Sequence, residues 1–231
     1  MTAVAIFVKT PGLSPVKTRL ARGIGAASAT EFHLRAASRV AAASRAAMPD
    51  VQPYWAVAEK TGTRDALWAG FPTVWQGEGE LGSRLHTVYS GLLQRHGAVL
   101  LIGADAPQVT PGLLSDAARS LRPEAPFTMG PASDGGFWLF GGRATVPETV
   151  WTGIAYSTAD TGAQLLAALG TFAEVGSAPA LSDADTMEDL PQLLCALSRL
   201  KEPSPEQTDL AVWLAELAAR LASKETAEDH A

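Results

Sequence analysis

The chain has 231 residues, a formal net charge of −6 and 47% hydrophobic residues, values that indicate a globular protein able to bury one substantial core. The acidic balance argues against a protein that coats nucleic acid or an acidic membrane, so neither is an expected partner. The one cysteine, Cys195, excludes intrachain disulfides and cysteine metal sites, and its apolar neighbours predict a core position.

The N-terminus lacks the charged start, apolar centre and cleavage site of a secretory signal peptide. No apolar run reaches the roughly 18 residues that a membrane-spanning helix needs. A soluble cytoplasmic protein is therefore expected, and the sequence leaves its oligomeric state open.

Apolar runs of the kind that form strands alternate along the chain with segments of helical period. The strand runs are residues 3–8, 52–58, 73–76, 98–102, 127–130, 136–140 and 172–175. Helices are expected at residues 28–47, 83–95, 111–121, 158–169, 187–200 and 206–222. A capping box of Ser28 and Glu31 is expected to open the first helix. The alternation predicts one α/β domain whose mostly parallel sheet is covered by helices on both faces.

We assign residues 1–200 to this domain and residues 201–231 to a linker, a C-terminal helix and a polar tail. The linker is KEPSPEQ, and the last ten residues are expected to fray. The helix carries an apolar stripe that could pack on its own domain or on a second subunit, formed by Leu210, Trp213, Leu214, Leu217 and Leu221.

Ligands of such sheets bind where loops leave the carboxyl ends of the strands, so the loops that follow strands deserve a search for chemistry. The first, KTPGLSPVKTRL, resembles half of a phosphate-binding P-loop, but Val16 stands where the second glycine belongs and Pro15 removes a backbone N–H. A Walker-type nucleotide hydrolase is therefore disfavoured. The loop could instead present Lys9, Lys17 and Arg19 to phosphate oxygens, or it could be a solvated basic turn.

The second loop, GADAPQVTP, follows the most apolar strand run. Thr110 and Pro111 supply the cap and first position of the next helix, which leaves Asp105 free for another role. A carboxylate there could hold Mg²⁺ against a phosphate, because that ion takes one or two carboxylates and fills its other sites with water and phosphate oxygens. The alternative is that Asp105 only orders the turn.

Two further loops carry acidic residues. Asp134 precedes two glycines between apolar runs, a pattern that a plain β-hairpin also explains. In DADTMEDL, Thr186 and Asp189 fit a capping box, whereas Asp183 and Asp185 precede the cap and are not explained by it. Alternate residues of an extended segment share one side, as metal ligands do, so these two aspartates are candidate ligands.

The segment GEGELG matches the dinucleotide fingerprint G-x-G-x-x-G and lies between an expected strand and helix. Its two glutamates would repel a pyrophosphate, and it follows the third strand rather than the first, so a nicotinamide or flavin site is disfavoured. A loop of Gly77, Gly79 and Gly82 that shapes a nucleoside pocket is more plausible, and Arg84 could reach a bound ligand.

The remaining polar and aromatic residues favour structural roles. His33, His86, His96 and His230 lack the spacing of metal ligands, and surface or packing positions explain them. Three of the six tryptophans, Trp55, Trp75 and Trp138, lie in strand runs and are expected in the core.

Five segments, in this order, carry a family resemblance: FVKTPGLSPVKTRLA, QGEGELGSRL, LLIGADAP, MGPASDGGFWLFG and DADTMEDL. With them the chain resembles the bacterial nucleotide-diphospho-sugar-transferase-like family of glycosyltransferase-A (GT-A) fold, some members of which are labelled arsenosugar-biosynthesis or radical-SAM-associated glycosyltransferases. The chain is more distantly similar to 2-phospholactate guanylyltransferase, molybdenum-cofactor guanylyltransferase and the CMP-Kdo synthetases, which transfer nucleotidyl groups.

The resemblance implies a single-domain GT-A-like α/β fold, a three-layer sandwich, and a role for each matching residue. Lys17 and Arg19 would meet the diphosphate or triphosphate of a nucleotide. Asp105 would be the ligand of Mg²⁺ or Mn²⁺ after the central strand, and Asp185 its partner ligand, with Asp183 in support.

The resemblance also places the ends of the substrates. Asp134 would face the acceptor, and the glycine loop 77–82 would border the nucleoside. The expected catalytic residues are then Lys17, Asp105 and Asp134. Two residues depart from the family pattern, because Ser14 stands where many relatives have glycine and Ala106 replaces a common serine. Neither change removes a charged group.

The favoured hypothesis is a Mg²⁺-dependent transferase that moves a nucleotidyl group from a nucleoside triphosphate to a small-molecule acceptor. Lysine and arginine on the first loop suit a departing pyrophosphate. One alternative is a glycosyltransferase with a nucleotide-sugar donor, which needs the same metal and cationic loop. A further alternative is a binding module of the same fold that has lost turnover.

Overall fold

The structure is a computed structural model, and it describes residues 1–228 of the chain. Its seven strands form one sheet in the order β3-β2-β1-β4-β6-β5-β7, in which β6 runs antiparallel to both neighbours and the other pairs are parallel. The strands are β1 (Thr2–Val8), β2 (Val51–Val57), β3 (Thr73–Trp75), β4 (Val99–Gly103), β5 (Phe127–Pro131), β6 (Phe137–Gly142) and β7 (Val175–Ser177). The expected mostly parallel sheet is confirmed.

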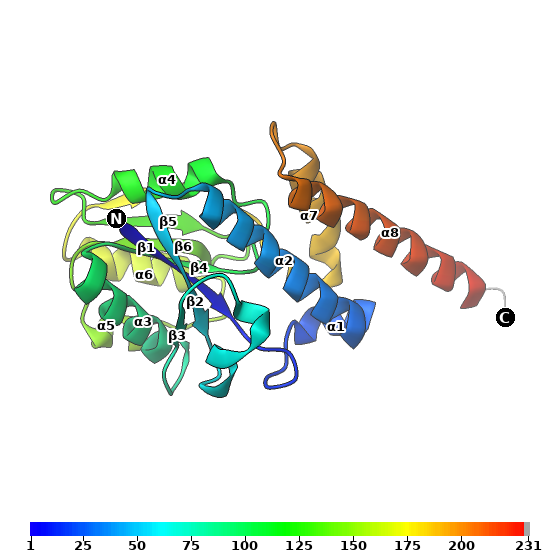
Figure 1. Ribbon diagram of the computed structural model, residues 1–231, viewed down its shortest axis with the longest axis horizontal. Coiled ribbons are helices and arrows are strands. Elements are labelled where there is room, and N and C mark those ends of the chain that lie inside the picture. Colours follow the sequence, from blue (N-terminus) through cyan, green and yellow to red (C-terminus); the bar gives the residue numbers. More distant parts are fainter. Residues whose placement is uncertain (229–231) are drawn as a thin grey trace.

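Helices cover both faces of the sheet and complete the three layers seen in Figure 1. One face packs against α2 and α4, and the other against α3, α5 and α6. The α-helices are α1 (Thr18–Ile24), α2 (Ala26–Ala46), α3 (Leu81–His96), α4 (Pro111–Ser120), α5 (Glu148–Thr152), α6 (Thr161–Gly170), α7 (Leu190–Ser198) and α8 (Pro205–Glu228), and the 3₁₀ helices are η1 (Thr61–Arg64), η2 (Ala66–Trp68) and η3 (Met187–Asp189).

The central strand β1 is buried on both faces, which explains its unbroken apolar run. Val4 and Ile6 belong to the core cluster on the side of α2 and α4, whereas Ala3 and Ala5 belong to the cluster on the side of α3. Successive side chains of a strand point to opposite faces, so one strand supplies both cores. The register sets Ile6 beside Ile102 of β4, at the centre of the sheet.

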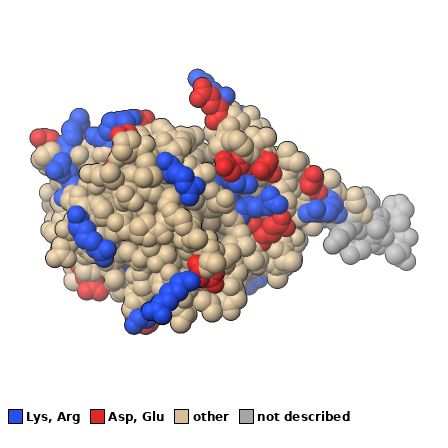
Figure 2. Space-filling view, in the orientation of Figure 1, with Lys and Arg blue, Asp and Glu red and all other residues tan. Residues whose placement is uncertain are grey.

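A third apolar cluster lies beside the sheet and joins α1, α2, α7 and α8. Trp213 of α8 stacks on Phe32 of α2, with ring centroids 6.4 Å apart and an interplanar angle of 28°. The apolar stripe of the C-terminal helix thus packs on its own chain. Figure 2 shows acidic and basic side chains interspersed where α8 meets α2, so the outer side of this packing is polar.

Two sequence-based predictions about α2 and α7 are wrong. Helix α2 begins at Ala26 after Gly25, without a side-chain cap, so Ser28 and Glu31 form no capping box. Cys195 is exposed rather than buried. The buried residues of α7 are Leu190, Leu193 and Leu197, and Cys195 lies two positions from either of the last two, on the opposite side of the helix.

The predicted elements otherwise match with shifted ends. The last strand begins at Val175 rather than at residue 172, because Phe172 sits in an exposed turn after α6. Helices α1 and α5 are short and were not predicted. Helix α8 continues to Glu228, and the rest of the tail, with His230, lies outside the described residues. No helix within residues 1–228 combines the length and apolar character that crossing a membrane requires.

Replacing Trp213 by alanine (Trp213→Ala) is expected to lower the free energy of unfolding by about 3–5 kcal/mol, because a buried aromatic ring is removed. The adjacent Val212 is 53% exposed, so Val212→Ala is the matched control and should cost within about 0.5 kcal/mol. Urea denaturation of both variants measures the difference. Equal losses in the two variants would contradict the packing of α8 on α2.

Candidate functional site

A cavity of about 660 Å³ opens where the central strands end. Phe7 and Val8 at the carboxyl end of β1 line it, as do Ile102 and Gly103 of β4. Trp138 lies at the start of β6, which runs in the opposite direction, so its first residues reach the same edge of the sheet. This is the edge at which open α/β sheets bind ligands.

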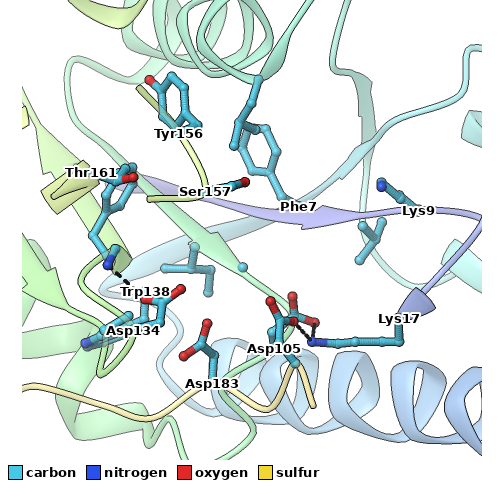
Figure 3. Close-up of a pocket in the computed structure, with 18 of the residues that line it drawn as sticks. Phe7, Lys9, Lys17, Asp105, Asp134, Trp138, Tyr156, Ser157, Thr161 and Asp183 are labelled. Atoms are coloured by element: carbon cyan, nitrogen blue, oxygen red, sulfur yellow. Dashed lines mark hydrogen bonds and ion pairs between the residues drawn. The ribbon is translucent and has the colours of Figure 1, made fainter. Parts of the chain in front are cut away.

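Seven of the predicted site residues line this cavity. They come from three loops after strands and from the segment before η3: Lys9, Lys17, Arg19, Asp105, Asp134, Asp183 and Asp185. Figure 3 shows Lys9 and Lys17 on one side, Asp134 beside Trp138 on the other, and Asp105 and Asp183 between them. The fold therefore brings together charged residues that are up to 176 positions apart in the sequence, from Lys9 to Asp185.

The glycine loop has a different place. Gly77, Gly79, Gly82 and Arg84 are not among the residues that line the cavity, which is bordered there by Gln76, Leu81 and Leu85. The Arg84 Nε donates a hydrogen bond of 2.8 Å to the Gly79 carbonyl oxygen. Helix α3 begins at Leu81 and turns its apolar side chains, rather than the glycines, toward the cavity.

Lys17 joins the two sides of the cavity floor. Its Nζ lies 3.1 Å from the Asp105 Oδ1 and 2.8 Å from the Asp185 Oδ1, and it donates a 2.7 Å hydrogen bond to the Ala184 carbonyl oxygen. The Lys17 side chain is only 4% exposed. Its backbone is left-handed, with φ of 46°, a strained conformation for a residue other than glycine. Strain of this kind is typical of functional sites.

The ion pairs decide the protonation states at this point. Burial disfavours the charge on Lys17, but Asp105 and Asp185 outweigh it and raise the pKa of the ammonium above its ordinary value. Burial likewise works against the charge on Asp185, and Lys17, with a smaller contribution from Arg19, lowers the pKa of that carboxyl overall. The centre of the cavity thus holds one buried cation between two carboxylates.

The same two carboxylates fit a metal cation by their chemistry. One oxygen of Asp105 and one of Asp185 converge on a single positive group, here the Lys17 ammonium. Within residues 1–228 no group of three or more His, Cys, Asp or Glu side chains is arranged to hold a metal ion alone. Two carboxylates suffice for Mg²⁺ when phosphate and water oxygens complete its shell.

The first loop is held by Glu59 and Trp68, which the sequence analysis did not single out, and by His33, for which it expected a surface or packing position. Glu59 accepts a 2.9 Å hydrogen bond from the Thr10 backbone N–H, and Trp68 Nε1 donates to the Thr10 hydroxyl at 3.0 Å. His33 Nε2 contacts the Lys9 carbonyl oxygen at 2.9 Å. Glu59 follows the carboxyl end of β2. The rule that ligands bind at the carboxyl ends of strands, here called the strand-end rule, could therefore have found it.

The far end of the cavity is acidic and aromatic. Burial, Asp134 and, more weakly, Asp185 raise the pKa of the Asp183 carboxyl to about 6. The Asp134 Oδ1 accepts a 2.8 Å hydrogen bond from the Gly136 N–H, as an ordered turn requires. Trp138 Nε1 donates to the Pro179 carbonyl oxygen at 2.9 Å, which fixes the indole ring beside these carboxylates.

Next to this end, a segment that sequence analysis assigned in part to a helix supplies the rim residues Tyr156, Ser157, Thr158 and Thr161. Ser157 has a left-handed φ of 60°. Gly135, at φ of 87°, sits so close to this rim that an added side chain would collide with the Ala159 carbonyl group. The Gly162 N–H donates to the Gly135 carbonyl oxygen at 2.8 Å. The Asp134 turn and the rim therefore form one fixed wall.

Replacing Asp183 by asparagine is expected to raise the free energy of unfolding at pH 8 and to change it little near pH 4. In the folded protein the pKa of Asp183 is about 6, above its ordinary value of 3.8. Ionisation of this carboxyl therefore lowers the free energy of unfolding as the pH rises between these two values. A shift of about two pKa units bounds the gain at roughly 3 kcal/mol. Urea denaturation at pH 4, 6 and 8 measures it.

The matched control is Asp160→Asn, an exposed aspartate outside the cavity lining. If Asp183→Asn stabilises the protein at pH 8 by no more than this control does, the surroundings of Asp183 do not raise the pKa of its carboxyl.

Solved structures share this fold. A protein from Desulfovibrio desulfuricans G20, provisionally named a nucleotide-diphospho-sugar transferase, matches with a TM-score of 0.81 and 23% identity over 96% of this chain and 97% of its own. CMP:2-keto-3-deoxy-manno-octonic acid synthetase complexed with CTP matches with a TM-score of 0.54 and 11% identity, covering 86% of this chain and 99% of its own. At these identities the likeness establishes the fold.

A third structure, Rv0371c of Mycobacterium tuberculosis H37Rv in complex with manganese, matches with a TM-score of 0.50 and 17% identity over 84% of this chain and 98% of its own. A comparison with curated proteins gave no match. The sequence model of one bacterial family matches residues 37–158, more than half of the chain and a span that includes Asp105 and Asp134. The chain belongs to this family, the uncharacterized proteins conserved in bacteria called DUF2064.

Proposed function

We propose that the protein is a metal-dependent nucleotidyltransferase, which transfers a nucleotidyl group from a nucleoside triphosphate to a small acceptor. One observation carries this proposal: the basic loop after β1 and two carboxylates line a single cavity. The carboxylates are Asp105 and Asp185, 80 positions apart in the sequence, and both contact the Lys17 ammonium. Phosphoryl chemistry needs this combination, because catalysis consists mainly of positioning the phosphates and neutralising their charge.

The basic end would hold the phosphates. Lys9 and Arg19 line the cavity and are exposed, so both can turn toward a ligand. Arg19 Nη1 lies 3.8 Å from the Asp185 Oδ2, a loose contact that leaves the guanidinium available for phosphate oxygens. The apolar side chains of Phe7, Leu81 and Leu85 border the same cavity and suit a nucleoside.

Asp105 and Asp185 would hold the metal, Mg²⁺ or Mn²⁺, and Asp183 would support them. The chemistry that a metal held there would supply is neutralisation of charge on the phosphate oxygens. The manganese in the Rv0371c structure supports metal use in this fold. Lys17 now lies between the two carboxylates, so it would turn toward a phosphate when a metal takes that place.

In the proposed reaction the oxygen of the acceptor attacks the α-phosphorus, the bond to the bridging oxygen of the β-phosphate breaks, and pyrophosphate leaves. Lys17 and Arg19 would stabilise the charge that develops on the leaving group. Asp134, at the opposite end of the cavity, would accept the hydrogen bond of an attacking hydroxyl and take its proton.

The second candidate is glycosyl transfer from a nucleotide sugar. The fold likeness to the protein from D. desulfuricans, at a TM-score of 0.81, favours it. The same basic loop and carboxylates would then hold a nucleoside diphosphate as the leaving group, and the acceptor would attack the sugar carbon. The identity of the stabilising nucleotide separates the two reactions.

The test is a thermal-shift series with the four nucleoside triphosphates and common nucleotide sugars, each with Mg²⁺ and with chelator. A ligand at about 100 times its Kd adds roughly 2.7 kcal/mol of stability. Mg²⁺-dependent stabilisation by a triphosphate and none by nucleotide sugars supports nucleotidyl transfer, and the reverse pattern supports glycosyl transfer. Absence of any nucleotide effect would leave only a binding module without turnover.

Replacing Asp105 by asparagine is expected to remove most of the Mg²⁺-dependent stabilisation by the nucleotide, because a neutral amide is a poor ligand for this ion. The loss is measured against the unliganded variant, since Asp105 also pairs with Lys17 and its removal changes the stability of the protein itself. Asp116→Asn, on the exposed side of α4, is the control. An unchanged nucleotide response in Asp105→Asn removes this residue from the metal site.

A further inference from the structure

The cavity has two ends of opposite charge. Lys9 and Lys17 lie at one end, Asp134 lies beside Trp138 at the other, and Asp183 lies between Asp134 and Asp105 (Figure 3). Arg19 lines the same cavity and lies 3.8 Å from Asp185. The proposed function uses the basic end for the nucleotide, which leaves the acidic end for the acceptor. Its chemistry therefore indicates which acceptors the protein can take.

We propose that the acceptor is an uncharged polyhydroxylated molecule, such as a sugar or polyol, and not a phosphorylated or carboxylated one. This inference rests on the proposed function only in calling the ligand an acceptor. The charge of the acidic end, its aromatic walls and its fixed shape each support it.

The negative charge of Asp134 and Asp183 opposes the binding of an anionic acceptor at this end of the cavity. In the part of the chain that the structure describes, neither Asp134 nor Asp183 forms an ion pair with a basic side chain, whereas Asp105 and Asp185 share Lys17. A phosphate or carboxylate bound beside Asp134 and Asp183 would meet two like charges. The Lys17 ammonium offsets them only in part, because it is already paired with Asp105 and Asp185. Like charges brought together in a binding site oppose binding strongly.

Hydroxyl groups fit the same residues. A carboxylate only accepts hydrogen bonds, and an alcohol supplies the donors. The Asp134 Oδ1 is engaged by the Gly136 N–H, which leaves the Oδ2 for a ligand. Ser157 is exposed on the cavity rim, where its hydroxyl can donate or accept. Figure 3 shows this hydroxyl facing the cavity.

The aromatic residues offer apolar surface rather than hydrogen bonds. The Trp138 N–H is already used by Pro179, and the Tyr156 hydroxyl donates to the Trp151 carbonyl oxygen at 3.0 Å. Their rings, with Phe137, can pack against the C–H faces of a sugar or polyol while the carboxylates bind its hydroxyls. A combination of apolar walls and a few fixed polar groups is typical of small-molecule sites.

The wall is rigid enough to select among ligands. Gly135 is wedged against the rim at Ala159, and the Gly162 N–H ties the two segments together. These contacts hold the backbone of the Asp134 turn, and the Gly136 N–H holds the Asp134 side chain through its Oδ1. Pre-organised polar groups discriminate well, because a mismatched ligand cannot be accommodated without breaking them.

The experiment compares ligands that share a skeleton and differ in charge. Saturation-transfer NMR on the intact protein would use D-glucose, D-glucose 1-phosphate and D-glucosamine, together with glycerol and glycerol 3-phosphate. We expect transfer to the neutral members, with the phosphorylated members bound about tenfold or more weakly. Stronger binding of the phosphates, preference for the amine, or no binding of either neutral probe would overturn the inference.

Two variants sharpen the result. The double variant Asp134→Asn/Asp183→Asn should reduce the neutral-over-phosphate preference about tenfold, because it removes both negative charges. Asp209→Asn, which removes an exposed carboxylate of α8 outside the cavity lining, should leave the preference unchanged. If the double variant keeps the wild-type preference, these two carboxylates do not set it.

Nucleotide binding in the same samples separates this inference from the proposed function. Mg²⁺-dependent stabilisation by a triphosphate, with a preference for phosphorylated probes, would overturn only the acceptor class. Binding of neutral probes without any nucleotide effect would overturn only the proposed reaction.

Discussion

The ammonium of Lys17 between Asp105 and Asp185 is the interaction on which the site depends. It joins the loop after β1, the loop after β4 and the segment before η3, parts of the chain separated by up to 168 positions. A buried lysine cannot remain charged without partners, and removal of either carboxylate would leave part of this charge unpaired. Such a cluster contributes little net stability by itself. Its value lies in fixing where three loops meet.

The same interaction divides the cavity. Lys9 and Lys17 lie on one side and Asp134 lies on the other, with Asp105 and Asp183 between them. A reaction that moves negative charge toward a leaving group gains from this arrangement, because the charge develops near cations and away from the carboxylates. A leaving group whose negative charge developed beside Asp134 and Asp183 would instead be repelled by these carboxylates. The polarity of the cavity thus suggests which end releases the leaving group.

Sequence reasoning was most informative where a physical rule linked pattern to place. Apolar runs identified β1 and β4 because both are buried on two faces, and the strand-end rule located Lys17, Asp105 and Asp134 in loops that meet in one cavity. The rule places residues near one another and assigns no roles, so those roles stay proposals.

Other features depend on contacts that no local pattern contains. Whether Gly77 or Leu81 faces the cavity depends on where α3 begins and how it rotates on the sheet. Ser157 follows a helix rather than a strand, so the strand-end rule passes over it. Cys195 sits in an apolar segment, yet the spacing of Leu190, Leu193 and Leu197 puts it on the other side of α7. The helical spacing of the buried leucines therefore predicts the exposure of Cys195 better than the apolar character of its neighbours does.

The third apolar cluster connects the stability of the fold to the geometry of the site. Ala184 is fully buried in it, and extended residues alternate in direction, so its neighbours Asp183 and Asp185 line the cavity. Leu20 of α1 packs in the same cluster, three residues beyond Lys17. Both the cation and one of its carboxylates are therefore anchored by the helices that α8 covers.

This coupling links the C-terminal helix to residues that line the cavity. Loss of packing between α8 and α2 would loosen α1 and the segment before α7 together, since all four helices share one cluster. Lys17 and Asp185 would then no longer be held at a fixed distance from each other. Asp105, which follows the central strand β4, would stay in place. The C-terminal helix thus stabilises the half of the site that the sheet does not hold.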